Sequence, residues 1–181
     1  MEYIFLHDKI LPAATAAPGV SNRSYRYGDG LFETIRVVND TIQFADEHVA
    51  RLLHGASILG YEWPVLYTQD YLSDCILSLC RKNKCGKKAR IRLSIYSGNG
   101  GLYDGDNRMG MLIECWSLPA ENGMLNSNGL VTGIYPEARK SCDIFSNLKT
   151  ANFLPYVMAA RYAKHNRLND CFVMNTREGL A

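Results

Sequence analysis

A single lysine, Lys149, lies between two mostly uncharged stretches, 142–148 and 151–163. A lysine amine bonds covalently to a carbonyl group only when it is uncharged, which requires a pKa far below its usual value of about 10.4. Apolar surroundings and a helix N-terminus both disfavour the cation, and we expect a helix to begin near Asn152. The alternative is an ordinary solvent-facing lysine. The residues around Lys149 leave both interpretations open.

Two arginines, Arg90 and Arg92, alternate with apolar residues in the segment Ala89–Tyr96. This alternation predicts a strand with one apolar face and one face that carries both guanidinium groups, about 6.5 Å apart. Such a pair suits a carboxylate or a phosphate, and the alternative is a solvated face with paired charges. A third arginine, Arg51, falls beside the apolar stripe of an expected helix and, taken alone, is a surface residue.

The bulk composition indicates a folded protein with a substantial core. The 181 residues are 47% hydrophobic and 21% charged, with a formal net charge of +2. This charge is too small to make nucleic acid the expected partner. No window reaches about 18 consecutive apolar residues, so we expect no membrane span. The N-terminal residues lack the pattern of a secretory signal, and we expect a cytoplasmic location.

Six cysteines and four histidines are present, in spacings that do not predict a metal site. We expect free cysteines, which pack as small apolar groups. The glycine-rich loop 97–107 matches neither the dinucleotide-binding nor the phosphate-loop pattern, so a flexible loop is expected there.

The chain is predicted to be an α/β protein in which strands and helices intermix. The segments 4–11, 30–38 with a hairpin return at 42–44, 89–96 and 109–118 are expected strands, and helices are expected from Asp46 to Gly60 and from 69 to 83. A linker-like stretch then precedes a strand from 129, a helix up to about 165 and a strand over 170–175. We therefore predict an α+β domain over 1–118, a linker over 119–128, and the first part of a second mixed α/β domain over 129–181.

The segment Tyr25–Tyr61 resembles the N-terminal signature of the class-IV aminotransferases, the fold-type IV pyridoxal-phosphate enzymes. The matching residues are Gly28-Asp29-Gly30, Phe32, Arg36, His48 and Arg51-Leu52. The segment "NLKTANFLPYVMAARYA" around Lys149 resembles the family's cofactor-lysine segment, and "DCFVMNTREGLA" resembles the strand and turn that follow it. The resemblance covers essentially the whole chain.

The resemblance implies roles for the residues singled out above. Lys149 would hold pyridoxal 5'-phosphate as a Schiff base, and Arg51 would contact the cofactor phosphate. Tyr27 and Phe32 would line the substrate pocket, and Arg92, with Arg90, would meet a substrate carboxylate. The implied activity moves an amino group between an amino acid, of branched-chain or D-amino-acid type, and a 2-oxo acid. The family also implies a homodimer.

Several departures from the pattern of the branched-chain aminotransferases leave a second activity possible by resemblance, that of an aminodeoxychorismate lyase. Phe153 stands where branched-chain aminotransferases have a tyrosine. Two residues separate Lys149 from Asn152, which is the spacing of the D-amino-acid aminotransferases and the aminodeoxychorismate lyases. The loop "GNGG" also resembles the "GSGG" of the lyases, whose substrate is aminodeoxychorismate.

The family pattern continues with a glutamate directly after "GLA" and with roughly a third more chain, whereas this sequence reaches Ala181. We therefore expect a piece that lacks the family's C-terminal third. The alternative from another functional class is a non-catalytic module of the same fold.

Overall fold

The computed structural model describes residues 1–16, 18–105, 108–119, 123–124 and 126–181. Two compact units can be distinguished by their internal contacts. The first unit comprises Met1–Asn122 together with Lys149–Ala151, and the second comprises Gly123–Leu148 and Asn152–Ala181. Lys149, which the sequence assigned to the second domain, thus belongs by its contacts to the first unit.

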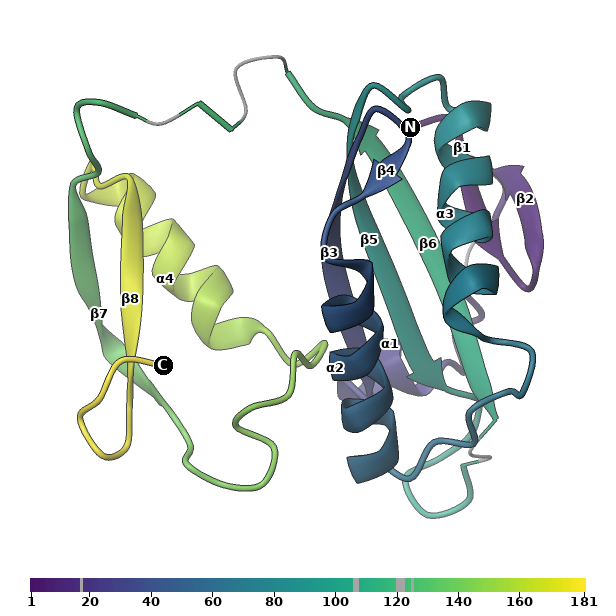
Figure 1. Ribbon diagram of the computed structural model, residues 1–181. Helices are drawn as coiled ribbons and strands as arrows, with labels where there is room; N and C mark the ends of the chain where they lie inside the picture. The colour runs from purple at the N-terminus through teal and green to yellow at the C-terminus, as the bar shows by residue number, and fades with distance from the viewer. Residues whose placement is uncertain (17, 106–107, 120–122, 125) are drawn as a thin grey trace. The chain divides into compact units, whose positions relative to one another are not determined.

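The first unit is built on an antiparallel sheet, six-stranded among the described residues, with the order β2-β1-β6-β5-β3-β4 (Figure 1). Its strands are β1 (Tyr3–Leu6), β2 (Lys9–Pro12), β3 (Gly30–Val38), β4 (Thr41–Ile42), β5 (Lys88–Ser97) and β6 (Met109–Ser117). The central strands β3, β5 and β6 pair along nearly their whole lengths, from Gly30↔Tyr96 to Val38↔Lys88 and from Ala89↔Ser117 to Ser97↔Met109. This long pairing gives the unit a rigid centre.

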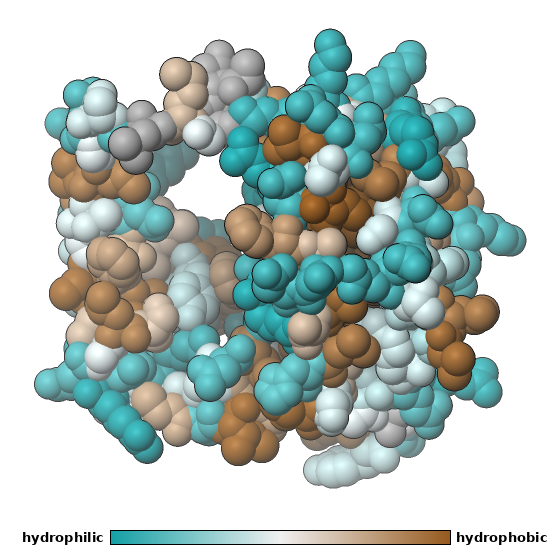
Figure 2. Space-filling view, viewed as in Figure 1, coloured by the Kyte–Doolittle hydropathy of each residue, from teal (hydrophilic) through white to brown (hydrophobic). Residues whose placement is uncertain are grey.

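The two faces of this sheet differ in composition because side chains alternate along each strand. Alternate residues of β3 and β5 form a buried apolar layer that includes Ile35, Ile91 and Leu93, each at most 3% exposed. Helices α2 (Ala45–Ile58) and α3 (Gln69–Lys82) lie over this side of the sheet (Figure 1). Figure 2 shows hydrophilic residues interspersed with hydrophobic ones over the outer surface of these helices. We call this covered side the helix face.

The opposite side of the sheet, the arginine face, is defined by Phe32, Arg90, Arg92, Ser94 and Tyr96. Register places Arg92 between Thr34 of β3 and Glu114 of β6. The sequence therefore predicted correctly that both arginines project from one side of this strand.

Helix boundaries differ slightly from the predicted ones. Asp46 was expected to cap α2, but the N-cap is Phe44, in a left-handed conformation with φ 56°. The helix begins directly after the β4 hairpin, so Asp46 lies in the first turn, where its charge complements the helix dipole. Helix α3 begins as a capped helix, with the Thr68 hydroxyl accepting a hydrogen bond from the Tyr71 N–H.

The short helix α1 (Arg23–Tyr27) leads into the first residues of β3. The Asn22 side chain accepts a hydrogen bond from the Tyr25 N–H at its start, and Gly28, at φ 71°, ends it. This left-handed conformation favours glycine. The turn places Asp29 directly before β3.

The second unit consists of β7 (Thr132–Lys140), α4 (Leu154–His165) and β8 (Asp170–Asn175). The two strands pair in parallel, as expected when a helix connects them. Tyr135, Ala159 and Val173 form its buried cluster. Helix α4 begins at Leu154, later than the predicted start near Asn152, and Pro155 stands in its first turn, where a proline is tolerated.

The mixed α/β class predicted from the sequence is confirmed. The division into 1–118, 119–128 and 129–181 stays a prediction, and residues 120–122 and 125 of the predicted linker lie outside the described residues. Among the helices of the described residues, none has the length and apolar composition needed to cross a bilayer.

Candidate functional site

Lys149 is held by backbone hydrogen bonds against the start of β3. The Phe32 N–H donates to the Lys149 carbonyl over 2.9 Å, and the Ala151 N–H donates to the Gly30 carbonyl over 2.8 Å. Leu31 and Thr150 form the antiparallel bridge between these two bonds. In this register Lys149 lies opposite Phe32, and opposed residues of antiparallel strands point to the same face. The main chain therefore directs the Lys149 side chain to the arginine face.

The Phe32 ring brings two cationic side chains together. The Lys149 Nζ lies 5.3 Å from the ring centroid, and the Arg92 Cζ lies 3.7 Å from it. Phe32 itself is only 4% exposed. Cations are attracted to an aromatic face, and the attraction strengthens where water is excluded. The structure thus gathers Lys149, Phe32 and Arg92, three of the six predicted site residues.

A pocket of about 330 Å³ lies on the arginine face, between β5, β6 and the region of α1. Arg92, Ser94, Tyr96 and Glu114 are among the residues that line it. Burial lowers the pKa of Arg92, while Glu114, with an oxygen 4.0 Å from Nε, opposes that shift. An arginine remains charged under all ordinary conditions. The pocket therefore contains a partly desolvated cation.

The Tyr96 hydroxyl, which the sequence did not single out, is buried and has no hydrogen-bond partner among the described residues. Burial raises the pKa of Tyr96, so this hydroxyl remains a neutral donor. Its ring crosses over Gly110, where a Cβ would collide with it. A buried unsatisfied hydroxyl is costly, which marks Tyr96 as an unusual residue of the pocket wall.

Arg51 lies in a different set of contacts, on the helix face. Its Nε and Nη2 donate to the two oxygens of Glu33, each over 2.5 Å, and the His48 Nδ1 lies 2.8 Å from Glu33 Oε2. Glu33 is 1% exposed, whereas the Arg51 side chain is 48% exposed. Burial alone would raise the pKa of Glu33, but the hydrogen bonds from Arg51 and His48 outweigh it and hold that pKa below its ordinary value. The carboxylate is thus charged and paired.

The remaining predicted residues occupy more peripheral places. The Arg90 guanidinium lies 5.9 Å from the ring centroid of Trp116, its cross-strand neighbour. Tyr27 is 44% exposed at the end of α1, with the Arg23 guanidinium 5.4 Å from its ring centroid. The side chains of Arg90 and Tyr27 therefore lie apart from Lys149 and Arg92, which contact the Phe32 ring.

Asp29, within the glycine motif, is fixed by two side chains that sequence reasoning missed. Arg23 Nε donates to one of its oxygens over 2.8 Å, and the Tyr61 hydroxyl donates to the other over 2.7 Å. Gly30 has no room for a side chain, because a Cβ there would meet Ser24 and the Ile95 carbonyl. These contacts fix the start of β3, to which the Lys149 segment is bonded.

A comparison with protein families identifies the group to which these features belong. The family model described as amino-transferase class IV matches residues 30–181, which include β3, Arg51 and Lys149. The chain belongs to this family. Enzymes of class IV use pyridoxal phosphate, and the resemblance inferred from the sequence is confirmed.

Individual relatives extend the comparison. A protein of Methanocaldococcus jannaschii assigned as a branched-chain-amino-acid aminotransferase is 27% identical over 176 residues, 96% of this chain and 60% of its own length. The structure of the branched-chain aminotransferase of Thermoproteus uzoniensis with norvaline has a TM-score of 0.80 at 21% identity, over 99% of this chain and 61% of that one.

A Legionella pneumophila protein assigned as a 4-amino-4-deoxychorismate lyase has a TM-score of 0.79 at 22% identity, over 93% of this chain and 60% of that one. The two structural comparisons establish the fold alone, and they include both an aminotransferase and a lyase. This chain spans about three fifths of the length of all three of these proteins.

Proposed function

We propose that this chain is part of a pyridoxal-phosphate enzyme that transfers an amino group between an amino acid and a 2-oxo acid, with Lys149 as the residue that holds the cofactor. The observation that carries the proposal is the placement of an amine and a guanidinium on one buried aromatic ring, Phe32. The family match supports pyridoxal phosphate as the cofactor. The backbone hydrogen bonds of the Lys149 segment to β3 support Lys149 as its attachment point.

The residues present fit an anionic group that carries an aldehyde. Pyridoxal phosphate, when bound, supplies that aldehyde and a ring that accepts electrons from the substrate. Lys149 offers a primary amine on a fixed segment of main chain, and its Nζ would carry the proton that the reaction moves. Arg51 uses Nε and Nη2 for Glu33, so Nη1 is available to a phosphate.

The pocket beside Arg92 supports an amino-acid substrate. Its guanidinium would pair with the substrate carboxylate, and Tyr96 forms part of the wall of the same pocket. We propose Arg90, Tyr27 and Phe32 as the surrounding residues of this site. A carboxylate and an α-amine are common to all amino acids, so we base the proposed choice of a branched-chain or D-amino acid on the family resemblance.

A 4-amino-4-deoxychorismate lyase is the second candidate, favoured by the "GNGG" loop and by the similarity to the Legionella protein, whereas the two-residue spacing between Lys149 and Asn152 fits both a lyase and a D-amino-acid aminotransferase. The two activities differ in their product. Incubation with aminodeoxychorismate would release pyruvate and 4-aminobenzoate from a lyase. Incubation with a branched-chain amino acid or D-alanine and a 2-oxo acid would give a new amino acid from an aminotransferase.

An absorbance titration tests the proposal before any substrate is chosen. Purified protein mixed with pyridoxal phosphate should develop a visible band that Lys149→Met lacks. Lys82 provides a matched control, because its Nζ also lies near an aromatic ring, 4.6 Å from the centroid of Tyr3. The Lys82→Met variant should keep the band. Equal spectra for the protein and for Lys149→Met would contradict the proposal and favour a non-catalytic module.

We also propose that the protein acts as a homodimer in the cytoplasm. Size-exclusion chromatography with light-scattering detection would measure the molar mass of the protein directly. Twice the mass of the chain is the expected result, and the mass of a single chain would contradict the dimer without bearing on the role of Lys149.

A further inference from the structure

Three buried cysteines converge on the helix face, away from the proposed site. Cys80 and Cys115 are 0% exposed and Cys85 is 4% exposed. The Sγ atoms of Cys85 and Cys115 are 2.6 Å apart, and those of Cys80 and Cys115 are 3.7 Å apart. From this geometry we propose that Cys85 and Cys115 are a site of reversible oxidation, at which a peroxide converts the two thiols into a disulfide.

The end of helix α3 positions Cys85. The Lys84 N–H donates to the Arg81 carbonyl over 3.1 Å, and the Cys85 N–H donates to the Cys80 carbonyl over 3.0 Å. Lys84 has a φ of 56°, and these features together form a Schellman motif. In this motif the residue after the left-handed position folds back over the last helical turn, here onto Cys80. Cys85 is therefore fixed by the main chain and not by a flexible loop.

The central strand β6 positions Cys115, which lies opposite Ile91 of β5 in the middle of the sheet. An Sγ–Sγ distance of 2.6 Å exceeds the disulfide bond length of about 2.05 Å by only about half an ångström. Formation of the bond therefore requires little movement of either segment.

A metal ion is the other group that three thiols could hold, and the distances disfavour it. For Zn–S bonds of about 2.3 Å, sulfurs 2.6 Å apart would subtend about 70° at the metal, far below the tetrahedral angle. A bound ion would require Cys85 and Cys115 to separate within a close-packed core.

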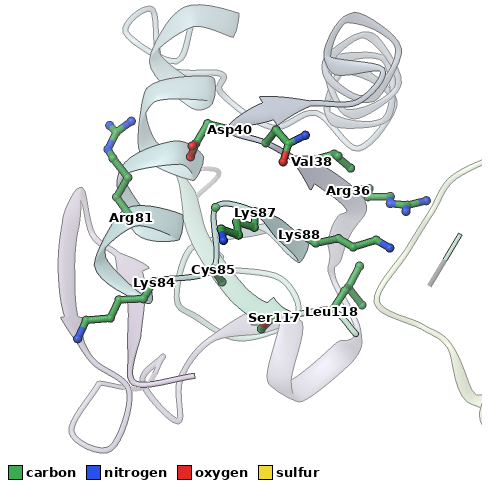
Figure 3. A pocket seen from close by; sticks show the side chains of 12 residues that line it. Arg36, Val38, Asp40, Arg81, Lys84, Cys85, Lys87, Lys88, Ser117 and Leu118 are labelled. Carbon is green, nitrogen blue, oxygen red and sulfur yellow. The ribbon is translucent and has the colours of Figure 1, made fainter. Parts of the chain in front are cut away.

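Cys85 is also the member of the cluster that an oxidant can reach. It lines a cavity of about 760 Å³ together with side chains that include Arg81, Lys84 and Lys87 (Figure 3). With 4% exposure, Cys85 admits only a small oxidant such as hydrogen peroxide. Burial raises the pKa of the Cys85 thiol, so the reaction should quicken as the pH rises and more thiolate forms.

The reaction consumes one peroxide for each disulfide. The Cys85 thiolate attacks one peroxide oxygen, the O–O bond breaks and the sulfur becomes a sulfenic acid. The Cys115 sulfur then attacks the Cys85 sulfur, the S–O bond breaks and water leaves. In total, two thiols and one hydrogen peroxide give one disulfide and two waters, and a thiol reductant reverses the change.

Mass spectrometry tests this proposal. The reduced protein is treated with hydrogen peroxide, denatured in excess N-ethylmaleimide and weighed. We expect a product with four alkylated cysteines instead of six and a tryptic peptide pair that joins Cys85 to Cys115. The oxidised form should melt about 5–10 °C higher, because the bond closes a loop of about 30 residues.

Matched variants separate this site from the other cysteines. Cys115→Ala should abolish the cross-link, whereas Cys142→Ala, which alters an exposed cysteine, should keep it. If Cys115→Ala does not fold, the peptide map of the unaltered protein still decides the question. Alkylation of both Cys85 and Cys115 after treatment, a cross-link through Cys142, or a stoichiometric metal released on denaturation would each overturn the proposal.

Discussion

The two faces of the first unit's sheet hold their cations in opposite ways. On the helix face, Arg51 is bonded through two nitrogens to the buried carboxylate of Glu33, which His48 also contacts. On the arginine face, Lys149 and Arg92 lie against the Phe32 ring, and a carboxylate oxygen of Glu114 lies 4.0 Å from Arg92 Nε. The Arg51 charge is largely neutralised by Glu33, which leaves Nη1 for the proposed phosphate contact, whereas the charges on the arginine face lack a comparably close carboxylate among the described residues.

This difference suggests a division of labour. The ion pair with Glu33 fixes the position of Arg51, and removal of Arg51 alone would leave the buried Glu33 carboxylate without its main partner, at a cost in stability. A cation on an aromatic ring is stabilised less than one paired with a carboxylate, so it can still bind an anionic ligand. Apart from the proposed contact of Arg51 Nη1 with the phosphate, the helix face should therefore govern stability, and the arginine face should govern substrate binding.

Lys149→Met should have the largest effect, a loss of amino-transfer of about 10³-fold or more, because a thioether side chain can neither bond to the aldehyde nor carry a proton. Its free energy of unfolding should change by less than about 1 kcal/mol, since the backbone bonds to β3 remain. Steady-state rates and urea unfolding measure the two effects. A large loss of stability with normal rates would reverse the proposed division.

Arg51→Leu should have the next largest effect, on stability. The substitution leaves the Glu33 carboxylate buried with only His48, which should lower the free energy of unfolding by about 3 kcal/mol without any cofactor present. Arg92→Leu is the matched control on the arginine face and should cost about 1 kcal/mol or less. Urea unfolding of the two variants checks the contrast, and equal losses would refute it.

Arg92→Leu should instead weaken substrate binding. A hydrogen bond between two charged groups contributes about 1.5–3 kcal/mol, so KM for the amino acid should rise about 10–100-fold with a smaller change in kcat. Arg90→Leu, beside Trp116, should change KM less. Steady-state kinetics compares the two variants, and an equal rise in KM would place the substrate carboxylate between both arginines.

The smallest effect concerns pH. Because the folded pKa of Glu33 lies below its ordinary value of 4.5, its contribution to stability is complete above the unfolded pKa and is lost as the pH falls through the folded one. The stability of the unaltered protein should therefore fall more steeply below about pH 4.5 than that of Glu33→Gln. Thermal melting across this acidic range measures both slopes, and parallel curves would show that Glu33 is not the group that titrates.

The sequence predicted most of the strands and helices, because alternation and helical spacing are local properties. The strand that carries Arg90 and Arg92, with its apolar opposite side, follows directly from the order of its residues. The start of α2 was wrong because a hairpin, and not a polar cap, leads into that helix. Such a start depends on the turn that precedes it and not on the helix itself.

The candidate site was less predictable, because its contacts join residues far apart in the chain. Lys149 and Arg51 could be selected by type and by their motifs, but the placement of Lys149 against Phe32 depends on pairing between segments distant in the sequence. The partners of Arg51 were missed since a glutamate within an apolar strand carries no local sign of its ion pair. The one available signal was Glu33 itself, a charged residue at a buried position of the alternation.

The role of Lys149 is tested most directly by a map of where the cofactor attaches. The protein is incubated with pyridoxal phosphate, treated with borohydride, digested and analysed by mass spectrometry. We predict that the phosphopyridoxyl group is found on the peptide that contains Lys149 and is lost in Lys149→Met. Attachment spread over several surface lysines, with Lys149 unmodified, would contradict it.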